Sequence, residues 1–253
     1  MDKWIVKRRF EAALKHYELQ AKVQREVCRQ MADELALLQP KPRRALEVGA
    51  GTGLLTRELL KLVPQAHWWL NDLSEKAEAY LAPMLAKTKH AFLWGDAETL
   101  AFPGNLELLA SASTVQWFDD LPRFLKKCAA HSLPGALLAL STFGPENFRE
   151  VRATTGRALH YYSAEAFAEM VVCSGYEILS LRDFQTELLF DTPAEVLRHI
   201  KATGTSGTGY FRWTAGRLRE FELKYRRDFG APGLDGKVSL TYAPILLTAR
   251  KYP

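Results

Sequence analysis

Short apolar runs alternate with segments of helical periodicity through the middle of the chain. The apolar runs predict strands at 45–48, 67–70, 91–94, 106–111 and 135–143, and the spacing between them predicts helices at 54–63, 74–86 and 120–130. Strands that alternate with helices are typical of βαβ units, and unbroken apolar runs fit strands that are buried on both faces. The pattern therefore predicts an α/β fold, in which a parallel sheet carries helices on both faces.

The two ends of the chain depart from this alternation. Residues 1–40 carry apolar residues at helical spacing and predict one or two helices before a break at 40–42. The last third predicts a helix at 163–173, a strand at 176–190, a helical stretch at 191–235 and a strand within 238–251. We expect a single domain over 1–253, made of an N-terminal helical cap (1–40), a core (41–190), a helical insertion (191–235) and the last strand (236–253).

Composition adds exclusions to this picture. The chain has 253 residues, of which 47% are hydrophobic and 25% charged, a balance that excludes disordered and fibrous proteins. No apolar run approaches the ~18 residues that span a bilayer, and no apolar segment typical of a secretory signal follows the first charges. Three scattered cysteines form no CxxC pair and the histidines form no HExxH motif. We expect a cytoplasmic protein with no membrane contact, no disulfide framework and no bound metal.

A glycine-rich segment, Glu47-Val48-Gly49-Ala50-Gly51-Thr52-Gly53, follows a predicted strand and precedes a predicted helix. This is the context of a nucleotide-binding loop, in which glycines adopt positive φ and let a ligand approach the backbone. The spacing departs from the dinucleotide fingerprint, and no Lys-Ser/Thr pair follows as a P-loop requires. Glu47 is unsuited to a pyrophosphate but suits a ligand with an ammonium and a sulfonium, such as S-adenosyl-L-methionine.

Carboxylates also follow the next two predicted strands. Asp72 is placed to accept hydrogen bonds from both hydroxyls of a ribose, and Asp96 is placed at an adenine amine, with Ala97 supplying backbone contacts. Acidic residues at three successive strand ends are more specific than one glycine loop. The alternative is a plain tight turn with surface acids that cap helices.

These residues resemble a known enzyme class. The segments 47–53, 71–74 and 95–98 resemble the class I S-adenosyl-L-methionine-dependent methyltransferases. More narrowly, the chain is similar to the malonyl-[acyl-carrier protein] O-methyltransferase family of biotin synthesis, on Phe10-Glu11-Ala12-Ala13 with Tyr17, Ala21 and Gln24, on 113–118 and on 197–204. One departure is the pair Glu47 and Ala50, where many relatives have Asp and Cys; the substitution keeps charge and small size.

The resemblance implies a Rossmann-like methyltransferase sheet with an N-terminal helical lid and an insertion before the last strand. It implies S-adenosyl-L-methionine as cofactor and methylation of the free carboxylate of malonyl-acyl-carrier protein, or of malonyl-CoA, early in biotin synthesis. The cofactor-binding residues that we predict are Glu47, Gly49, Gly51, Gly53, Asp72, Leu73, Asp96, Ala97 and Ser113.

The predicted catalytic residues are Tyr17, Gln116 and Trp117. A malonyl carboxylate is ionised at neutral pH and needs no general base, so the enzyme must align the reactants and exclude water. Tyr17 lies on one stripe of the first helix, which in the implied architecture covers the pocket; simple packing is the alternative. Gln116 and Trp117 follow the fourth predicted strand, beside the implied acceptor, with a loop or core role as the alternative.

The positive charges leave more than one interpretation open. Arg149, His199 and Lys201 are candidates for binding the substrate carboxylate, although each could be a solvated surface residue. The glycine-rich loop 204–209 fits a flexible lid turn better than a phosphate site. The net charge of +5 raises nucleic acid as a partner, but the basic clusters are short, interleaved with acids and unaccompanied by a base-methylation motif.

We therefore expect a monomer whose partner is an acidic acyl-carrier protein, without nucleic acid. The alternatives are a class I methyltransferase that acts on another small carboxylic acid or a quinone precursor, and a nucleic-acid-binding or non-catalytic protein of methyltransferase-like fold.

Overall fold

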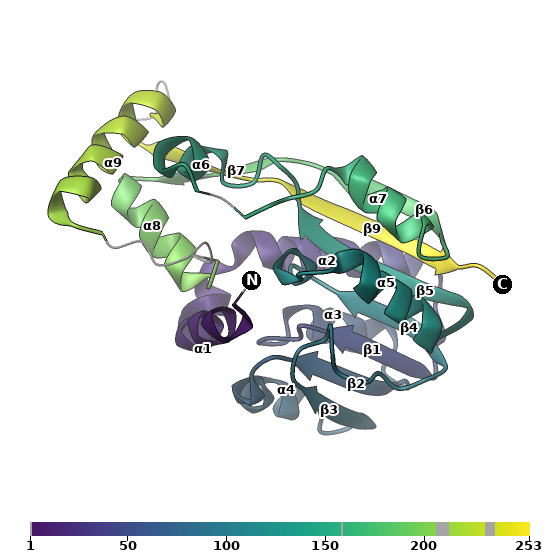
Figure 1. The fold of residues 1–253 in the computed structure, drawn as a ribbon. Coiled ribbons are helices and arrows are strands. Elements are labelled where there is room, and N and C mark those ends of the chain that lie inside the picture. The colour runs from purple at the N-terminus through teal and green to yellow at the C-terminus, as the bar shows by residue number, and fades with distance from the viewer. Residues whose placement is uncertain (1, 158, 206–212, 231–235) are drawn as a thin grey trace.

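The computed structural model describes residues 2–157, 159–205, 213–230 and 236–253 (Figure 1). Seven strands form the main sheet in the order β3-β2-β1-β4-β5-β9-β6. Their bounds are β1 Arg44–Val48, β2 His67–Asp72, β3 His90–Trp94, β4 Leu106–Ser111, β5 Ser132–Phe143, β6 Tyr176–Asp183 and β9 Pro244–Lys251. Strands β1 to β5 pair in parallel, whereas β9 is antiparallel to both of its neighbours, β5 and β6.

Helices cover both faces of this sheet. Their bounds are α1 Lys3–Gln20, α2 Lys22–Leu37, α3 Leu54–Leu62, α4 Glu78–Leu85, α5 Leu121–His131, α6 Arg149–Thr155, α7 Ala164–Val172, α8 Pro193–Ala202 and α9 Ala215–Phe229, with short 3₁₀ helices η1 Glu75–Ala77 and η2 Val115–Trp117. Successive residues of β4 face opposite cores: Leu108 joins the core with Leu59 of α3, and Leu109 joins the core with Phe124 of α5. The strands therefore lack polar alternation because both faces are buried.

The C-terminal third differs from the predicted elements. The run 176–190 is two strands, β6 and β7 (Thr186–Phe190), and the run 238–251 is also two, β8 (Val238–Tyr242) and β9. β7 and β8 pair antiparallel in a separate two-stranded sheet, from which α8 and α9 extend (Figure 1). The prediction of one strand in each run was wrong because apolar composition does not show where a strand leaves one sheet for another. The helix α6 was not predicted, and the expectation of one domain stays a prediction.

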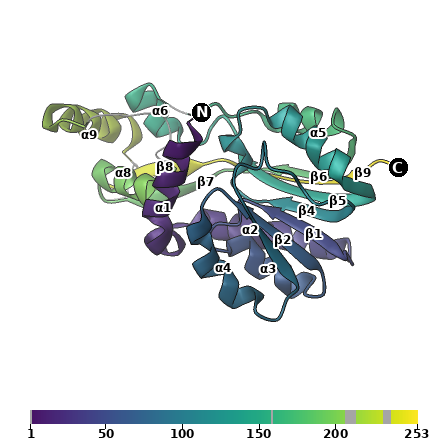
Figure 2. The same cartoon turned by 60° about the horizontal axis from the view of Figure 1, so that its bottom comes forward.

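The N-terminal helix α1 lies across the carboxyl ends of the parallel strands, between the sheet and α8 (Figures 1 and 2). Asp2 begins this helix by accepting hydrogen bonds from the backbone N–H groups of Trp4 and Ile5. The chain then turns at the fully buried Ala21 into α2, which packs on α3. Within the described residues, no helix combines the length and the apolar character of a membrane-spanning segment.

Candidate functional site

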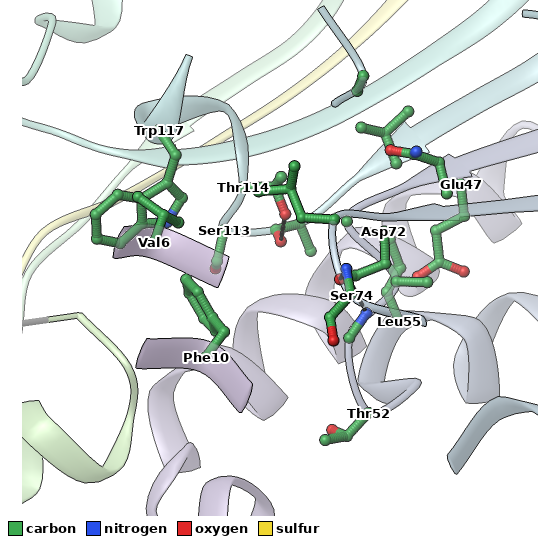
Figure 3. Close-up of a pocket in the computed structure, with 18 of the residues that line it drawn as sticks. Val6, Phe10, Glu47, Thr52, Leu55, Asp72, Ser74, Ser113, Thr114 and Trp117 are labelled. Carbon is green, nitrogen blue, oxygen red and sulfur yellow. Dashed lines mark hydrogen bonds between the residues drawn. The ribbon is translucent and has the colours of Figure 1, made fainter. Parts of the chain in front are cut away.

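A pocket opens at the carboxyl ends of β1, β2 and β4, beneath α1 (Figure 3). Its empty space is about 1050 Å³, counting the solvent at its mouth, which is large enough for a nucleotide-sized ligand. The walls come from α1, from the glycine loop after β1, from the ends of β2 and β3, and from residues 112–118 after β4. Ligands of open α/β sheets bind at this edge, because the loops that follow the parallel strands meet there.

The three glycines of the loop differ in the space around their Cα atoms. All three adopt positive φ, at +72°, +53° and +84° for Gly49, Gly51 and Gly53. A Cβ atom on Gly49 would lie 2.1 Å from Thr114 Oγ1, and one on Gly53 would lie 2.4 Å from Met84 Cε, whereas one on Gly51 would meet nothing within 4 Å. Gly49 and Gly51 line the pocket, and Gly53 instead lies at the start of α3. Close packing against Thr114 therefore requires Gly49, the positive φ favours glycine at Gly53, where the flexible tip of Met84 could move aside, and Gly51 leaves open space.

Asp72, at the end of β2, is held by the glycine loop. Its Oδ2 accepts a hydrogen bond of 2.9 Å from the Gly51 N–H, and its Oδ1 accepts one of 2.9 Å from the Ser74 N–H. Burial raises the pKa of this carboxyl, although the backbone donors oppose the shift. Both oxygens keep lone pairs, and Asp72 and its neighbour Leu73 line the pocket. The arrangement fits a vicinal diol such as a ribose.

Glu47, on β1, is a buried carboxyl with a single neutral side-chain donor. It is 1% exposed, and Thr56 Oγ1 donates to its Oε2 at 2.7 Å. Burial raises the pKa of Glu47 to about 8, and the charge of Asp72 adds to the shift. Because the side chain lines the pocket, a cationic group placed there would stabilise the ionised form. An ammonium is such a group.

Asp96 and Ala97 follow β3 and line the far part of the pocket. The Asp96 Oδ1 accepts a hydrogen bond of 3.0 Å from the Glu98 N–H and lies 3.9 Å from Lys3 Nζ. Ala97 is 4% exposed. Their predicted contact with an adenine stays a prediction.

Polar contacts of two residues, Lys3 and Glu11, hold α1 over the pocket. Near its start, Lys3 Nζ forms an ion pair with Glu98 and donates to the Trp117 carbonyl oxygen at 2.8 Å. Near the middle of α1, Glu11 accepts hydrogen bonds of 2.7 Å from Ser74 Oγ and of 2.7 Å from Lys76 Nζ. These residues were not predicted, because contacts between α1 and loops more than sixty residues away leave no local signal in the sequence.

The predicted catalytic residues fall in different places. Tyr17 and Trp117 line the pocket, and burial raises the pKa of the Tyr17 hydroxyl, which stays protonated and able to donate. Gln116 is not among the pocket-lining residues; its Nε2 donates to the Ser113 carbonyl oxygen at 2.7 Å. Gln116 thus supports the pocket wall to which Ser113 and Trp117 belong.

The predicted substrate cations do not line this pocket. Arg149 pairs with Glu187 at 3.0 Å, and Lys201 is exposed on α8. His199 is buried, with Nε2 at 2.8 Å from the Tyr242 hydroxyl, and burial lowers its pKa to about 4, so it carries no charge at neutral pH. The structure therefore gives no support to their role in carboxylate binding, which stays a prediction. Of the loop 204–209, residues 206–209 lie outside the described residues.

Comparisons with known proteins identify methyltransferases that are similar to this chain. A family model described as a methyltransferase domain matches residues 19–181. The malonyl-[acyl-carrier protein] O-methyltransferase of Porphyromonas gingivalis is 35% identical over 99% of this chain and 96% of its own length, and that of Haemophilus influenzae is 35% identical over 99% and 95%. A relative of the same name from Bacteroides fragilis is 38% identical, and the chain spans 51% of its length.

Solved structures show the same fold at low identity. A methyltransferase structure from Bacillus halodurans has a TM-score of 0.64 at 17% identity and covers 88% of this chain and 99% of its own. The N-methyltransferase NodS of Bradyrhizobium japonicum, solved with S-adenosyl-L-homocysteine, has a TM-score of 0.61 at 11% identity and covers 97% of this chain and 98% of its own.

The sheet order, the glycine loop and the matching domain define an S-adenosyl-L-methionine-dependent methyltransferase of class I. The residues present fit that cofactor, since the pocket offers a buried carboxyl at Glu47, free lone pairs at Asp72 and open space at Gly51. Within this class, the chain belongs to the malonyl-[acyl-carrier protein] O-methyltransferase family. The predicted α/β fold, enzyme class and cofactor are confirmed.

Proposed function

We propose that this protein methylates the free carboxylate of a malonyl group that an acyl-carrier protein carries as a thioester, in biotin synthesis. The observation that carries the proposal is the end-to-end similarity to relatives named for this reaction, which are covered over 95–96% of their length. The pocket supports the proposal as well. Next to the glycine loop with its acidic Glu47, the pocket has a second wall that is largely apolar, and an acceptor can lie against that wall.

The cofactor would be held by the residues that follow the strands. Glu47 would bind its ammonium, Asp72 its ribose hydroxyls, and Asp96 with Ala97 its adenine. When bound, S-adenosyl-L-methionine supplies a methyl group on a positively charged sulfur. The chain itself needs no general base, because a malonyl carboxylate is already ionised at neutral pH.

The remaining task of the protein is to align the acceptor and exclude water. Val6 and Phe10 of α1 lie over the pocket, and the Phe10 ring packs edge-to-face on Trp117 with centroids 5.7 Å apart (Figure 3). This apolar cover would keep solvent away from the reacting oxygen. The protonated Tyr17 hydroxyl on the same helix would donate a hydrogen bond near the transfer site.

An acidic carrier protein is a suitable partner for a chain of net charge +5. Complementary charge speeds encounter more than it tightens binding, and salt screens it over about 8–10 Å. Turnover of malonyl-acyl-carrier protein should therefore fall with added salt, while the affinity for S-adenosyl-L-homocysteine should change little. An equal response of both measurements would remove charge steering from the proposal.

The decisive experiment is to incubate the protein with S-adenosyl-L-methionine and malonyl-acyl-carrier protein and to detect the methyl ester by mass spectrometry. Malonyl-CoA and succinyl-acyl-carrier protein, run in parallel, test the carrier and the acid. Asp72→Asn serves as the inactive control, since it removes the charge that would bind the ribose. Ester on succinyl but not on malonyl substrates would overturn the proposal.

A further inference from the structure

Three buried hydrogen-bond donors of the described pocket lining lack a protein partner, and two of them, on Ser113 and Trp117, belong to the segment after β4; the third is Thr52 Oγ1. Trp117 Nε1 and Ser113 Oγ have no hydrogen-bond partner among the residues that the structure describes, although both atoms are shielded from solvent. The whole Trp117 side chain is 4% exposed. Leaving a buried donor unpaired costs stability, so an unpaired donor in a binding pocket points to a ligand.

The two donors lie together on one wall. Both belong to the segment after β4 and face the same part of the pocket, beneath Val6 and Phe10 of α1 (Figure 3). In this structure α1 lies over both atoms (Figure 3), and the ion pair and hydrogen bonds of Lys3 and Glu11 hold the helix there.

The local backbone holds this wall in an unusual conformation. Ser113 has φ of +51°, a left-handed conformation that is uncommon for a residue with a Cβ atom. Its N–H donates a hydrogen bond to Ser141 Oγ, and its carbonyl oxygen accepts one of 2.7 Å from Gln116 Nε2. Hydrogen bonds therefore hold both the N–H and the carbonyl group of Ser113. Backbone strain of this kind persists where the surroundings hold it, and it gathers at functional sites.

The charges around the pocket suggest what these donors bind. No arginine is among the described residues that line the pocket; of its two lysines, Lys3 pairs with Glu98, and the charge of Lys7 acts on the carboxyls of Glu11 and Asp72. An acceptor carboxylate that meets a strong cation loses basicity, and with it the electron pair that must attack. Neutral donors bind an anionic oxygen through charge-assisted hydrogen bonds and leave its charge in place.

We propose that Trp117 Nε1–H and Ser113 Oγ–H bind one oxygen of the acceptor carboxylate, which rests on the proposed function of this same pocket. The second oxygen stays free, and its electron pair forms the bond to the methyl carbon while the displaced pair remains on sulfur. The resulting ester is neutral and accepts weaker hydrogen bonds than the carboxylate did. The same two donors therefore favour the substrate over the product, which assists product release.

Two substitutions remove the donors and keep the wall. Trp117→Phe keeps an aromatic ring against Phe10 but loses the N–H, and Ser113→Gly loses the hydroxyl at a φ that glycine adopts without strain. Each should weaken malonyl-pantetheine binding to the protein saturated with S-adenosyl-L-homocysteine by about 10–100-fold, measured by calorimetry. The affinity of Trp117→Phe for S-adenosyl-L-homocysteine should stay within about twofold of the wild-type value. Trp94→Phe is the matched control, since Trp94 packs on Phe92 and does not line the pocket.

The binding measurement separates this subsite from the proposed function. Binding of malonyl-pantetheine that Trp117→Phe and Ser113→Gly both retain would overturn the subsite, even if the wild-type protein forms the methyl ester. Absence of wild-type binding would overturn it as well. If the wild-type protein binds malonyl-pantetheine through these donors but forms no ester on the carrier protein, the proposed function fails while the subsite stands.

Discussion

Glu47 should couple cofactor binding to pH. Its carboxyl is 1% exposed and burial raises its pKa to about 8, so about one protein molecule in ten has the ionised form at pH 7. Because an ammonium stabilises the ionised form, each unit of pH below 8 should weaken the binding of S-adenosyl-L-homocysteine by up to tenfold, or about 1.4 kcal/mol. Above pH 8 the affinity should level off, until the ammonium itself titrates.

Glu47→Gln removes this titration at nearly constant side-chain size. At pH 8.5 the variant should bind S-adenosyl-L-homocysteine about 10–100-fold more weakly than wild type, the value of a charge-assisted hydrogen bond. At pH 6 the two proteins should differ by less than about threefold, since the wild-type carboxyl is then also neutral. Calorimetry at several pH values measures both numbers, and Glu177→Gln, at an exposed position of β6, is the matched control.

The stability of the ligand-free protein provides a second readout with a definite sign. The pKa of Glu47 is about 8 in the folded chain and 4.5 in the unfolded chain. Between pH 4.5 and pH 8 the folded state therefore binds more protons than the unfolded state. Its contribution to the free energy of unfolding is present below pH 4.5 and is lost as pH rises through 8. Glu47→Gln should therefore gain relative stability at high pH while losing affinity. Wild-type affinity that is independent of pH, together with unchanged binding by the variant, would refute this reasoning.

Three further predictions concern packing, the α1 cover and the buried histidine. Gly49→Ala should lower the free energy of unfolding by about 2–4 kcal/mol in a urea titration, because its Cβ would meet Thr114 at a φ of +72°; an unchanged midpoint would contradict the packing. Lys3→Met removes the ion pair with Glu98, so backbone amides of α1 should exchange hydrogen several-fold faster, and unaltered protection would show that the pair does not hold the helix. His199 has a pKa of about 4, below its unfolded value of 6.5, so stability should fall by up to roughly 3 kcal/mol as pH drops through this window. His199→Phe should flatten that fall, and parallel wild-type and variant curves would count against it.

The core of the fold was predictable because its signals are local. Strands β1 to β4 are short apolar runs, and polar groups that line the pocket lie at or just after the carboxyl end of each. In a parallel sheet these strand ends share one edge, so the sequence alone predicts that Glu47, Asp72 and Asp96 lie close together. The family resemblance extended that prediction to the cofactor.

The course of the C-terminal third was less predictable. An apolar run does not show whether a strand stays in one sheet, so the division of 176–190 and 238–251 between two sheets escaped the pattern. The same is true of His199, whose family-like surroundings suggested a substrate cation, whereas burial beside Tyr242 lowers its pKa and leaves it neutral. Burial is a property of the packed chain and not of the segment.

The sequence by itself determined the strand–helix alternation, the glycine loop and the acids at the strand ends, because each depends on residues that are neighbours along the chain. Only the tertiary structure decided that Lys3 and Glu11 are the residues that hold α1 over the pocket, and that Ser113 and Trp117 present unpaired donors beneath it. These features depend on distances between segments 60 to more than 100 residues apart. Such distances are set by the packing of helices on the sheet, which no local periodicity records.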